Sequence, residues 1–344
     1  MFGKKGRNLV GLDIGSSAIK AIELTEEGDD VIVTGYGFKG LTADDQGRKA
    51  EVIREVMEQA GIRTTRVATA VSGRSVIVRY VNMQTMDDNE LKNAIKYEAE
   101  KYIPFDVNEV VMDCQRIDPV AGREAAGEMR VLLVAVKRNV IEEHYKLLQA
   151  AGLNSILIDV DVFALGNSYE LQSLAAAGKN PREKVIAIVD IGASKADINI
   201  IRGTVSQFTR EIYLGGNDCT EALAKKWGVE PAAAEEKKQE ADTSEDIRQA
   251  LTPILDDLAN EINLSFDYYE NQFDQEVDAV YLSGGLAGLS FLAEYFSKSL
   301  GKSCTRWNPL ENIRIDASRV SEETLAQHYN RLAVSLGLAA RIKG

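Results

Sequence analysis

The chain is 344 residues long; 45% of its residues are hydrophobic and 27% are charged. At about 150 residues per domain, this length predicts two domains or one divided core, and the hydrophobic fraction excludes a disordered or fibrous chain. Forty lysines and arginines against 53 aspartates and glutamates leave a formal net charge of −13. A surface this acidic argues against a groove for nucleic acid and against direct attraction to anionic lipid.

Cysteine and histidine are too sparse for a disulfide framework or a histidine metal site. The cysteines Cys114, Cys219 and Cys304 lack CxxC spacing, and the two histidines each lie within a helical pattern. An odd, sparse cysteine count is typical of a reducing compartment. No apolar stretch reaches the roughly 18–20 residues of a membrane span. We therefore expect a cytoplasmic protein without direct membrane insertion.

In chain order, the first 151 residues predict two consecutive α/β units. A meander of three strands, a helix and a fourth strand come first, because apolar or alternating runs are separated by glycine and polar turns. Residues 72–149 then form a strand, a helix, two strands and a helix, enough for an inserted subdomain. The predicted strands are 8–14, 18–24, 31–38, 66–71, 75–82, 110–116 and 131–136, and the predicted helices are 50–60, 87–102 and 139–151.

The remaining residues predict a strand at 156–160 and, after the polar loop 178–184, a second α/β half that includes a helical region. A meander of buried-type strands is followed by helices, one of them long and amphipathic, and then by a strand that runs into two glycines. The predicted strands are 156–160, 185–190, 196–202, 205–210 and 278–283, and the predicted helices are 220–227, 232–244, 247–273 and 322–342.

The most informative feature is an internal duplication. DIGSSAIKAI, which begins at Asp13, aligns with DIGASKADIN, which begins at Asp190. Each copy is an apolar strand that ends in Asp-x-Gly, a turn of small residues and a second strand. Two such hairpins predict two similar half-molecules that face each other.

These hairpins have the chemistry of a phosphate site. Small-residue turns let backbone N–H groups converge on an anion, and serine hydroxyls add donors. An aspartate repels phosphate, but a water-bound Mg²⁺ can lie between them, so we predict that Asp13 and Asp190 hold Mg²⁺. A later Ser283-Gly284-Gly285 offers a glycine wall for the adenine of ATP or ADP. The nucleotide contacts predicted in the three turns are Gly15, Ser16, Ser17, Lys20, Gly192, Ala193, Ser194, Lys195, Gly284, Gly285 and Leu286.

The three turns look like the phosphate-1, phosphate-2 and adenosine motifs of the actin, Hsp70 and sugar-kinase superfamily. Within it, residues 72–149, with EAEKYIPF at 98–105, resemble the PilM branch, close to the cell-division protein FtsA. SVIVRY, VLLVAV, IDVDVFAL and LGLAAR extend the resemblance along essentially the whole chain.

The resemblance implies an actin-like (ribonuclease H-like) α/β fold of two lobes with the nucleotide in the cleft between them. Lobe one would comprise residues 1–66, 150–178 and 320–344, and residues 72–149 would be the inserted subdomain. Lobe two would comprise residues 185–214 and 277–319, with 215–276 as its helical subdomain.

Further nucleotide contacts follow from the same resemblance. Glu221 and Lys225 would face the ribose and adenine, although a solvent-exposed ion pair explains their spacing equally well. Gly215 and Gly216 would let a helix N-terminus approach phosphate. Two residues depart from the family pattern: Lys195 stands where a hydroxyl is usual, and Leu286 stands where a third glycine is usual.

The resemblance also implies a function in type IV pilus assembly at the inner membrane. The chain would be a scaffold that recruits the N-terminal cytoplasmic segment of a PilN-like bitopic membrane protein; a homodimer is left open. The residues assigned to this partner are Leu91, Ile95, Tyr102, Ile103, Pro104 and Phe105, and the alternative is that they fill the core of the subdomain.

Hydrolysis is a separate question, because turnover also needs a group that positions or deprotonates water. Asp159 and Asp161 are weak candidates, and Asp161 can instead cap the following helix. We expect at most a slow ATPase in which nucleotide is a conformational ligand. An FtsA-like or GspL-like cytoskeletal or secretion component is the alternative, and a sugar or acetate kinase is less favoured.

Overall fold

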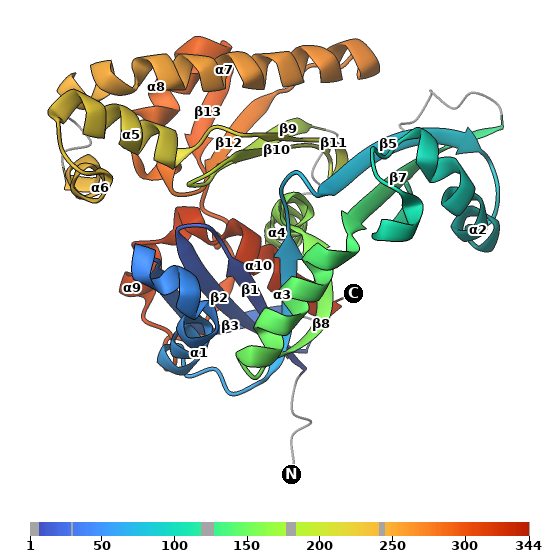
Figure 1. The fold of residues 1–344 in the computed structure, drawn as a ribbon, viewed down its shortest axis with the longest axis horizontal. Helices are drawn as coiled ribbons and strands as arrows, with labels where there is room; N and C mark the ends of the chain where they lie inside the picture. Colours follow the sequence, from blue (N-terminus) through green and yellow to red (C-terminus); the bar gives the residue numbers. More distant parts are fainter. Residues whose placement is uncertain (1–6, 29, 118–126, 177–183, 241–244, 344) are drawn as a thin grey trace. The chain divides into compact units, whose positions relative to one another are not determined.

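A computed structural model describes residues 7–28, 30–117, 127–176, 184–240 and 245–343 (Figure 1). The chain divides into two compact units. The insert unit is Val71–Ala150, and the main unit is formed by Met1–Ala70 and Ala151–Gly344.

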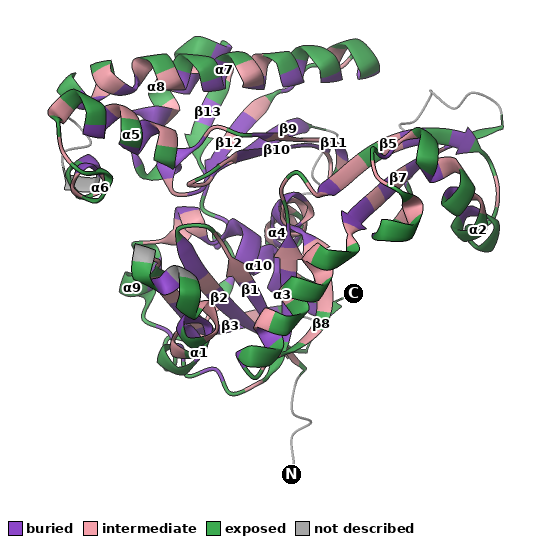
Figure 2. Cartoon of the chain, viewed as in Figure 1, coloured by how far each residue is buried: buried purple, intermediate pink, exposed green. Residues whose placement is uncertain are grey.

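The first sheet of the main unit has six strands in the order β14-β3-β2-β1-β4-β8. Strands β1 to β3 form an antiparallel meander, and β4 pairs parallel to β1. Helix α1 packs on β2 and β3. Most side chains of β1 and β2 are buried (Figure 2). The bounds are β1 Asn8–Ile14, β2 Ala18–Glu27, β3 Asp30–Gly40, α1 Lys49–Gln59, β4 Arg66–Val71, β8 Asn154–Val160 and β14 Arg314–Ile315.

The second sheet repeats this plan with five strands in the order β11-β10-β9-β12-β13. Strands β9 to β11 form the meander, and β12 pairs parallel to β9, as β4 does to β1. The internal duplication of the sequence is therefore a duplication of structure. The bounds are β9 Val185–Ile191, β10 Ala196–Arg202, β11 Val205–Ile212, α5 Gly216–Trp227, α6 Pro231–Glu240, α7 Glu245–Phe273, β12 Ala279–Ser283, α8 Leu292–Leu300 and β13 Ser303–Arg306.

Two helices, α4 (Asp161–Ala175) and α10 (Ala333–Ala339), connect the sheets. Helix α10 packs on α4 and β1, and α4 packs on β10, where the Asn199 amide donates to the Val162 carbonyl at 2.8 Å. The two helices approach so closely that a Cβ on Gly337 would lie 1.7 Å from the Ala164 carbonyl oxygen. Only glycine fits at this contact.

The C-terminal segment differs from the single helix predicted at 322–342. It forms α9 (Glu322–Ala326), a 3₁₀ turn at Tyr329–Arg331, and α10. The chain is diverted because Asn330 bonds to the turn after β12, as described below. Strand β14 already joins the first sheet at Arg314, whereas the second lobe was expected to continue to residue 319.

The insert unit is a three-stranded antiparallel sheet in the order β5-β7-β6, with α2 packed against it. Helix α2 begins at an Asp87 capping box, in which the Asp87 carboxylate accepts from the N–H groups of Asn89 and Glu90. The bounds are β5 Val76–Gln84, α2 Asp88–Glu98, β6 Val110–Ile117, β7 Glu128–Lys137 and α3 Arg138–Ala150.

Candidate nucleotide site

The first hairpin connects β1 to β2 through an exposed turn of small residues. The Gly15 N–H donates to the Ala18 carbonyl at 3.0 Å. Asp13 and Lys20 are cross-strand partners, and their carboxylate and ammonium groups lie 2.7 Å apart. Lys20, expected to contact nucleotide, is therefore the counter-charge of Asp13.

The second hairpin has the same closure and meets the first. The Gly192 N–H donates to the Lys195 carbonyl at 2.9 Å. The hydroxyls of Ser16 and Ser194, both exposed, lie 3.2 Å apart. The tips of the two predicted phosphate turns are therefore in contact, although these serines are separated by 178 positions in the sequence.

Asp190, the predicted magnesium ligand of the second hairpin, has a perturbed pKa. Burial raises its pKa from 3.8 to about 6, although a hydrogen bond from Ser283 and the charge of Lys20 oppose the rise. The negative charge of the Asp13 carboxylate also raises the pKa of Asp190, so the two predicted magnesium ligands interact electrostatically. Two neighbouring carboxylates that share a single nearby ammonium favour an additional cation.

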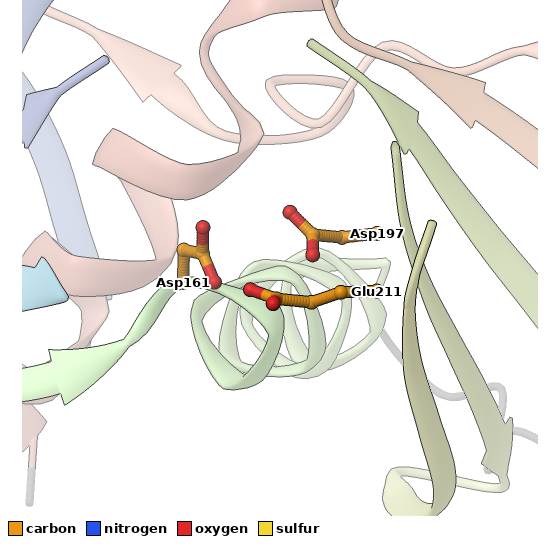
Figure 3. Close-up of side chains that lie close together, drawn as sticks. All are labelled: Asp161, Asp197 and Glu211. Carbon is orange, nitrogen blue, oxygen red and sulfur yellow. The ribbon is translucent and has the colours of Figure 1, made fainter. Parts of the chain in front are cut away.

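A cluster of three carboxylates surrounds Lys195. Asp161 at the start of α4, Asp197 in β10 and Glu211 in β11 point toward one another (Figure 3). Their carboxylate oxygens lie within 4.8 Å of one another. The Lys195 ammonium lies 2.8 Å from Asp161, 2.8 Å from Asp197 and 2.6 Å from Glu211. Burial would lower the pKa of Lys195, but the three carboxylates raise it above its usual range. Lys195 is therefore the internal counter-charge of this cluster.

The cluster changes two expectations for the site. Lys195 was expected to contact phosphate, but its three ion pairs direct its charge to carboxylates. Asp161, a weak candidate for a catalytic base, is held in an ion pair with the Lys195 ammonium. Asp159 accepts from the Val160 N–H at 2.8 Å and lies 3.9 Å from Arg341, and burial raises its pKa.

The N-terminus of α5 supports the second hairpin. The N–H groups of Gly216 and Asn217 donate to the carbonyls of Gly192 and Ala193 at 2.9 and 2.8 Å. A Cβ on Gly215 would lie 2.6 Å from the Ala193 oxygen, so glycine is needed for this approach. The Gly215 N–H donates to the Asp218 carboxylate at 2.7 Å, so both glycine amides already have partners, and the approach of this helix N-terminus to phosphate stays a prediction.

Further along α5, Glu221 and Lys225 are both exposed. Within the part of the chain that the structure describes, no ion pair joins them. They stay predicted ribose and adenine contacts.

The turn after β12 is fixed against the second hairpin. Ser283 is the cross-strand partner of Asp190, and Gly284 adopts a φ of 89°, which favours glycine. A Cβ on Gly284 would lie 2.3 Å from the Ile191 oxygen. Leu286 is 4% exposed, so its side chain packs inward and a nucleotide contact at this residue stays a prediction for its backbone.

Sequence reasoning missed the residues that hold this turn. The Gly284 N–H donates to the Asn330 carbonyl at 2.6 Å, and the Asn330 side-chain amide donates to the Gly284 carbonyl at 2.7 Å. The Ser283 oxygen also lies 3.1 Å from the Asn330 carbonyl oxygen, so its single proton serves either that carbonyl or Asp190. No sequence pattern indicated this role, because residues 322–342 were interpreted as one helix.

The residues assigned to a protein partner divide into two groups. Leu91, Ile95 and Ile103 are buried in the hydrophobic core of the insert unit, so their assignment to a partner surface is wrong. Their apolar spacing reflects the packing of α2 on the sheet. The accessible members of the set are Pro104, which is exposed, and Tyr102 and Phe105, which are half-buried.

Comparison with known proteins identifies the family. The family model for the type IV pilus assembly protein PilM matches residues 11–343. The chain belongs to the PilM family. A solved structure described as the PilM-PilN type IV pilus biogenesis complex is 29% identical, with a TM-score of 0.85, and 98% of each chain is covered.

Two more distant structures share the actin-like fold of this PilM-family chain. EutJ, an ethanolamine utilization protein from Carboxydothermus hydrogenoformans, is 18% identical with a TM-score of 0.57; 97% of this chain and 89% of that chain are covered. MreB5 of Spiroplasma citri, solved with bound ADP, is 11% identical with a TM-score of 0.50, and the coverage is 93% and 98%. None of the described helices has both the length and the apolar character needed to cross a membrane.

Proposed function

We propose that the chain binds ATP or ADP with Mg²⁺ where its two hairpins meet, and that the nucleotide acts as a conformational ligand. The observation that carries this proposal is the 3.2 Å contact between Ser16 and Ser194, which brings two turns of small residues together. A polyphosphate seated there would join β1 and β2 to β9 and β10.

The side chains near this point suit a magnesium ion. Mg²⁺ prefers carboxylate oxygens, often through its own waters. Asp13 and Asp190 supply carboxylates, and burial raises the pKa of Asp190 although the Lys20 charge opposes the rise. A bound Mg²⁺ would supply the missing positive charge and would screen both aspartates from phosphate.

Slow turnover is part of the proposal. A general base must be free to accept a proton from water. Asp161 is ion-paired with Lys195, and Asp159 already accepts a hydrogen bond from its neighbour. Nucleotide would therefore remain bound long enough to stabilise one conformation.

In cells, we propose, the chain is a scaffold of the type IV pilus inner-membrane complex that captures the N-terminal segment of a PilN-like protein. The family and the similarity to a PilM-PilN complex over 98% of both chains support this role. The accessible candidates in the insert unit are Tyr102, Pro104 and Phe105.

Thermal unfolding of nucleotide-free protein tests the nucleotide part. A ligand at 100 times its dissociation constant stabilises the folded state by about 2.7 kcal/mol. Wild-type protein should melt several degrees higher with Mg·ADP, and Ser194→Asp, which places a negative charge at the hairpin tip, should lose that shift. Ser303→Asp, at an exposed position of β13, is the matched control and should keep it.

Binding of a labelled PilN-like N-terminal peptide tests the scaffold part. We expect saturable binding that Phe105→Ala weakens. Tyr97→Ala removes an 81% exposed ring from α2 and should leave binding unchanged. Failure of the wild type to bind the peptide contradicts the scaffold proposal.

A further inference from the structure

The second glycine of the turn after β12 has an open face. A Cβ on Gly284 would meet the Ile191 backbone, but a Cβ on Gly285 would have one neighbour within 4 Å, the Nε atom of Arg331 at 3.8 Å. Gly285 is also half-buried rather than buried. The guanidinium of Arg331 therefore borders the space next to the Gly285 α-carbon, and, apart from the two neighbours of Gly285 in the chain, no other residue comes within 4 Å of the position that a Cβ would take.

Arg331 has an unusual environment for a largely enclosed arginine. Its guanidinium makes no hydrogen bond or ion pair with any residue that the structure describes. Burial lowers its pKa, and the charge of Glu235 opposes this shift. An enclosed guanidinium without a contacting anion normally costs free energy, which a ligand could recover.

An aromatic side chain supports Arg331. The guanidinium carbon lies 5.7 Å from the centre of the Phe38 ring. That ring is itself stacked on His328 at 4.0 Å, and the His328 ring nitrogen is hydrogen-bonded to the Tyr36 hydroxyl at 2.8 Å. Phe38 is the cross-strand partner of Lys20, which pairs with Asp13, so the three residues form a row across β3, β2 and β1.

We propose that Arg331 stacks its guanidinium on the purine ring of the bound nucleotide, over the open face of Gly285. This inference rests on the proposed nucleotide binding and adds the residue that recognises the base. A guanidinium is planar and delocalised, and it stacks favourably on aromatic rings. Gly285 leaves room for a flat ring to approach the backbone, while the hairpins, with Mg²⁺, receive the phosphates.

Calorimetric titration separates contact with the base from contact with phosphate. The ligands are AMP, ADP and Mg·pyrophosphate, and the variants are Arg331→Met, Arg331→Lys and Arg314→Met. Arg331→Met should weaken AMP and ADP equally, by about tenfold, the size of a partly desolvated cation–π contact, and should leave pyrophosphate unchanged. Arg331→Lys should recover part of the loss. Arg314 is an exposed arginine paired with Glu27 at 2.8 Å, and its replacement should not alter any affinity.

Each other result overturns the inference. Weaker binding of pyrophosphate and ADP together would make Arg331 a phosphate contact. If Arg331→Met folds and binds AMP and ADP with unchanged affinity, Arg331 has a structural role and does not contact the base. If Arg331→Met does not fold, unchanged affinity in Arg331→Lys leads to the same conclusion. A wild type that binds none of the three ligands contradicts the proposed function itself, which is a distinguishable outcome.

Discussion

Replacing Asp190 by asparagine removes a buried negative charge that destabilises the folded protein. Burial raises the Asp190 pKa from 3.8 to about 6. Each pKa unit corresponds to about 1.36 kcal/mol, so ionised Asp190 lowers the stability of the apo protein by about 3 kcal/mol above pH 6. Asparagine has nearly the same shape and can still hydrogen-bond to the Ser283 hydroxyl.

The sign of the effect follows from proton linkage. The folded state holds the proton more tightly, so this group lowers stability as pH rises from about 4 to about 6. Asp190→Asn should therefore stabilise the nucleotide-free protein by up to about 3 kcal/mol at pH 7.5 and by about half as much at pH 5. Urea unfolding at the two pH values measures the difference. The same variant should bind Mg·ATP more weakly.

Asp13→Asn is the informative comparison. Asp13 is paired with Lys20 at 2.7 Å, so its replacement should destabilise the protein by about 1–3 kcal/mol, the usual consequence of leaving one partner of a partly buried pair. If Asp190→Asn also destabilises the protein at pH 7.5, or if its gain is the same at pH 5, the account of Asp190 as an incompletely compensated carboxylate is wrong.

Three further substitutions test the packing and the charge cluster. Lys195→Met removes the counter-charge of three carboxylates and should lower stability by about 3–5 kcal/mol in urea unfolding, partly restored by Mn²⁺; unchanged stability contradicts the cluster. Gly337→Ala should unfold most of the protein by circular dichroism because its Cβ would lie 1.7 Å from a carbonyl oxygen, whereas Gly40→Ala, with open space around it, should be nearly silent. Ile95→Ala should destabilise the insert unit by about 2–4 kcal/mol and Tyr97→Ala by under about 0.5 kcal/mol; equal effects would refute the assignment of Ile95 to the core.

The hairpins could be predicted from sequence because their signal is local. A strand that ends in Asp-x-Gly and turns through small residues specifies its own hydrogen bonds, as in the Gly15 and Gly192 closures. The duplication then indicated that two similar sheets exist, which the matching orders of β1, β2, β3, β4 and β9, β10, β11, β12 confirm.

Long-range contacts were out of reach. Lys195 was visible as a departure from the family pattern, but its partner Asp161 lies 34 positions away and Glu211 lies 16 away. The cluster depends on the register that pairs Asp197 with Glu211 and on the packing of α4 against β10. Leu91 and Ile95 show the same limit, because apolar spacing on a helix does not distinguish a core from a docking surface. Asn330 was missed because its bonds to Gly284 interrupt a segment whose composition favours helix.

The central claim is that the two hairpins form one nucleotide site, and calorimetric titration of Mg·ATP into nucleotide-free protein tests it most directly. The account predicts saturable binding of one nucleotide per chain, weakened at least tenfold in both Asp13→Ala and Asp190→Ala. Absence of binding by the wild type, or equal affinity in either folded variant, would contradict it.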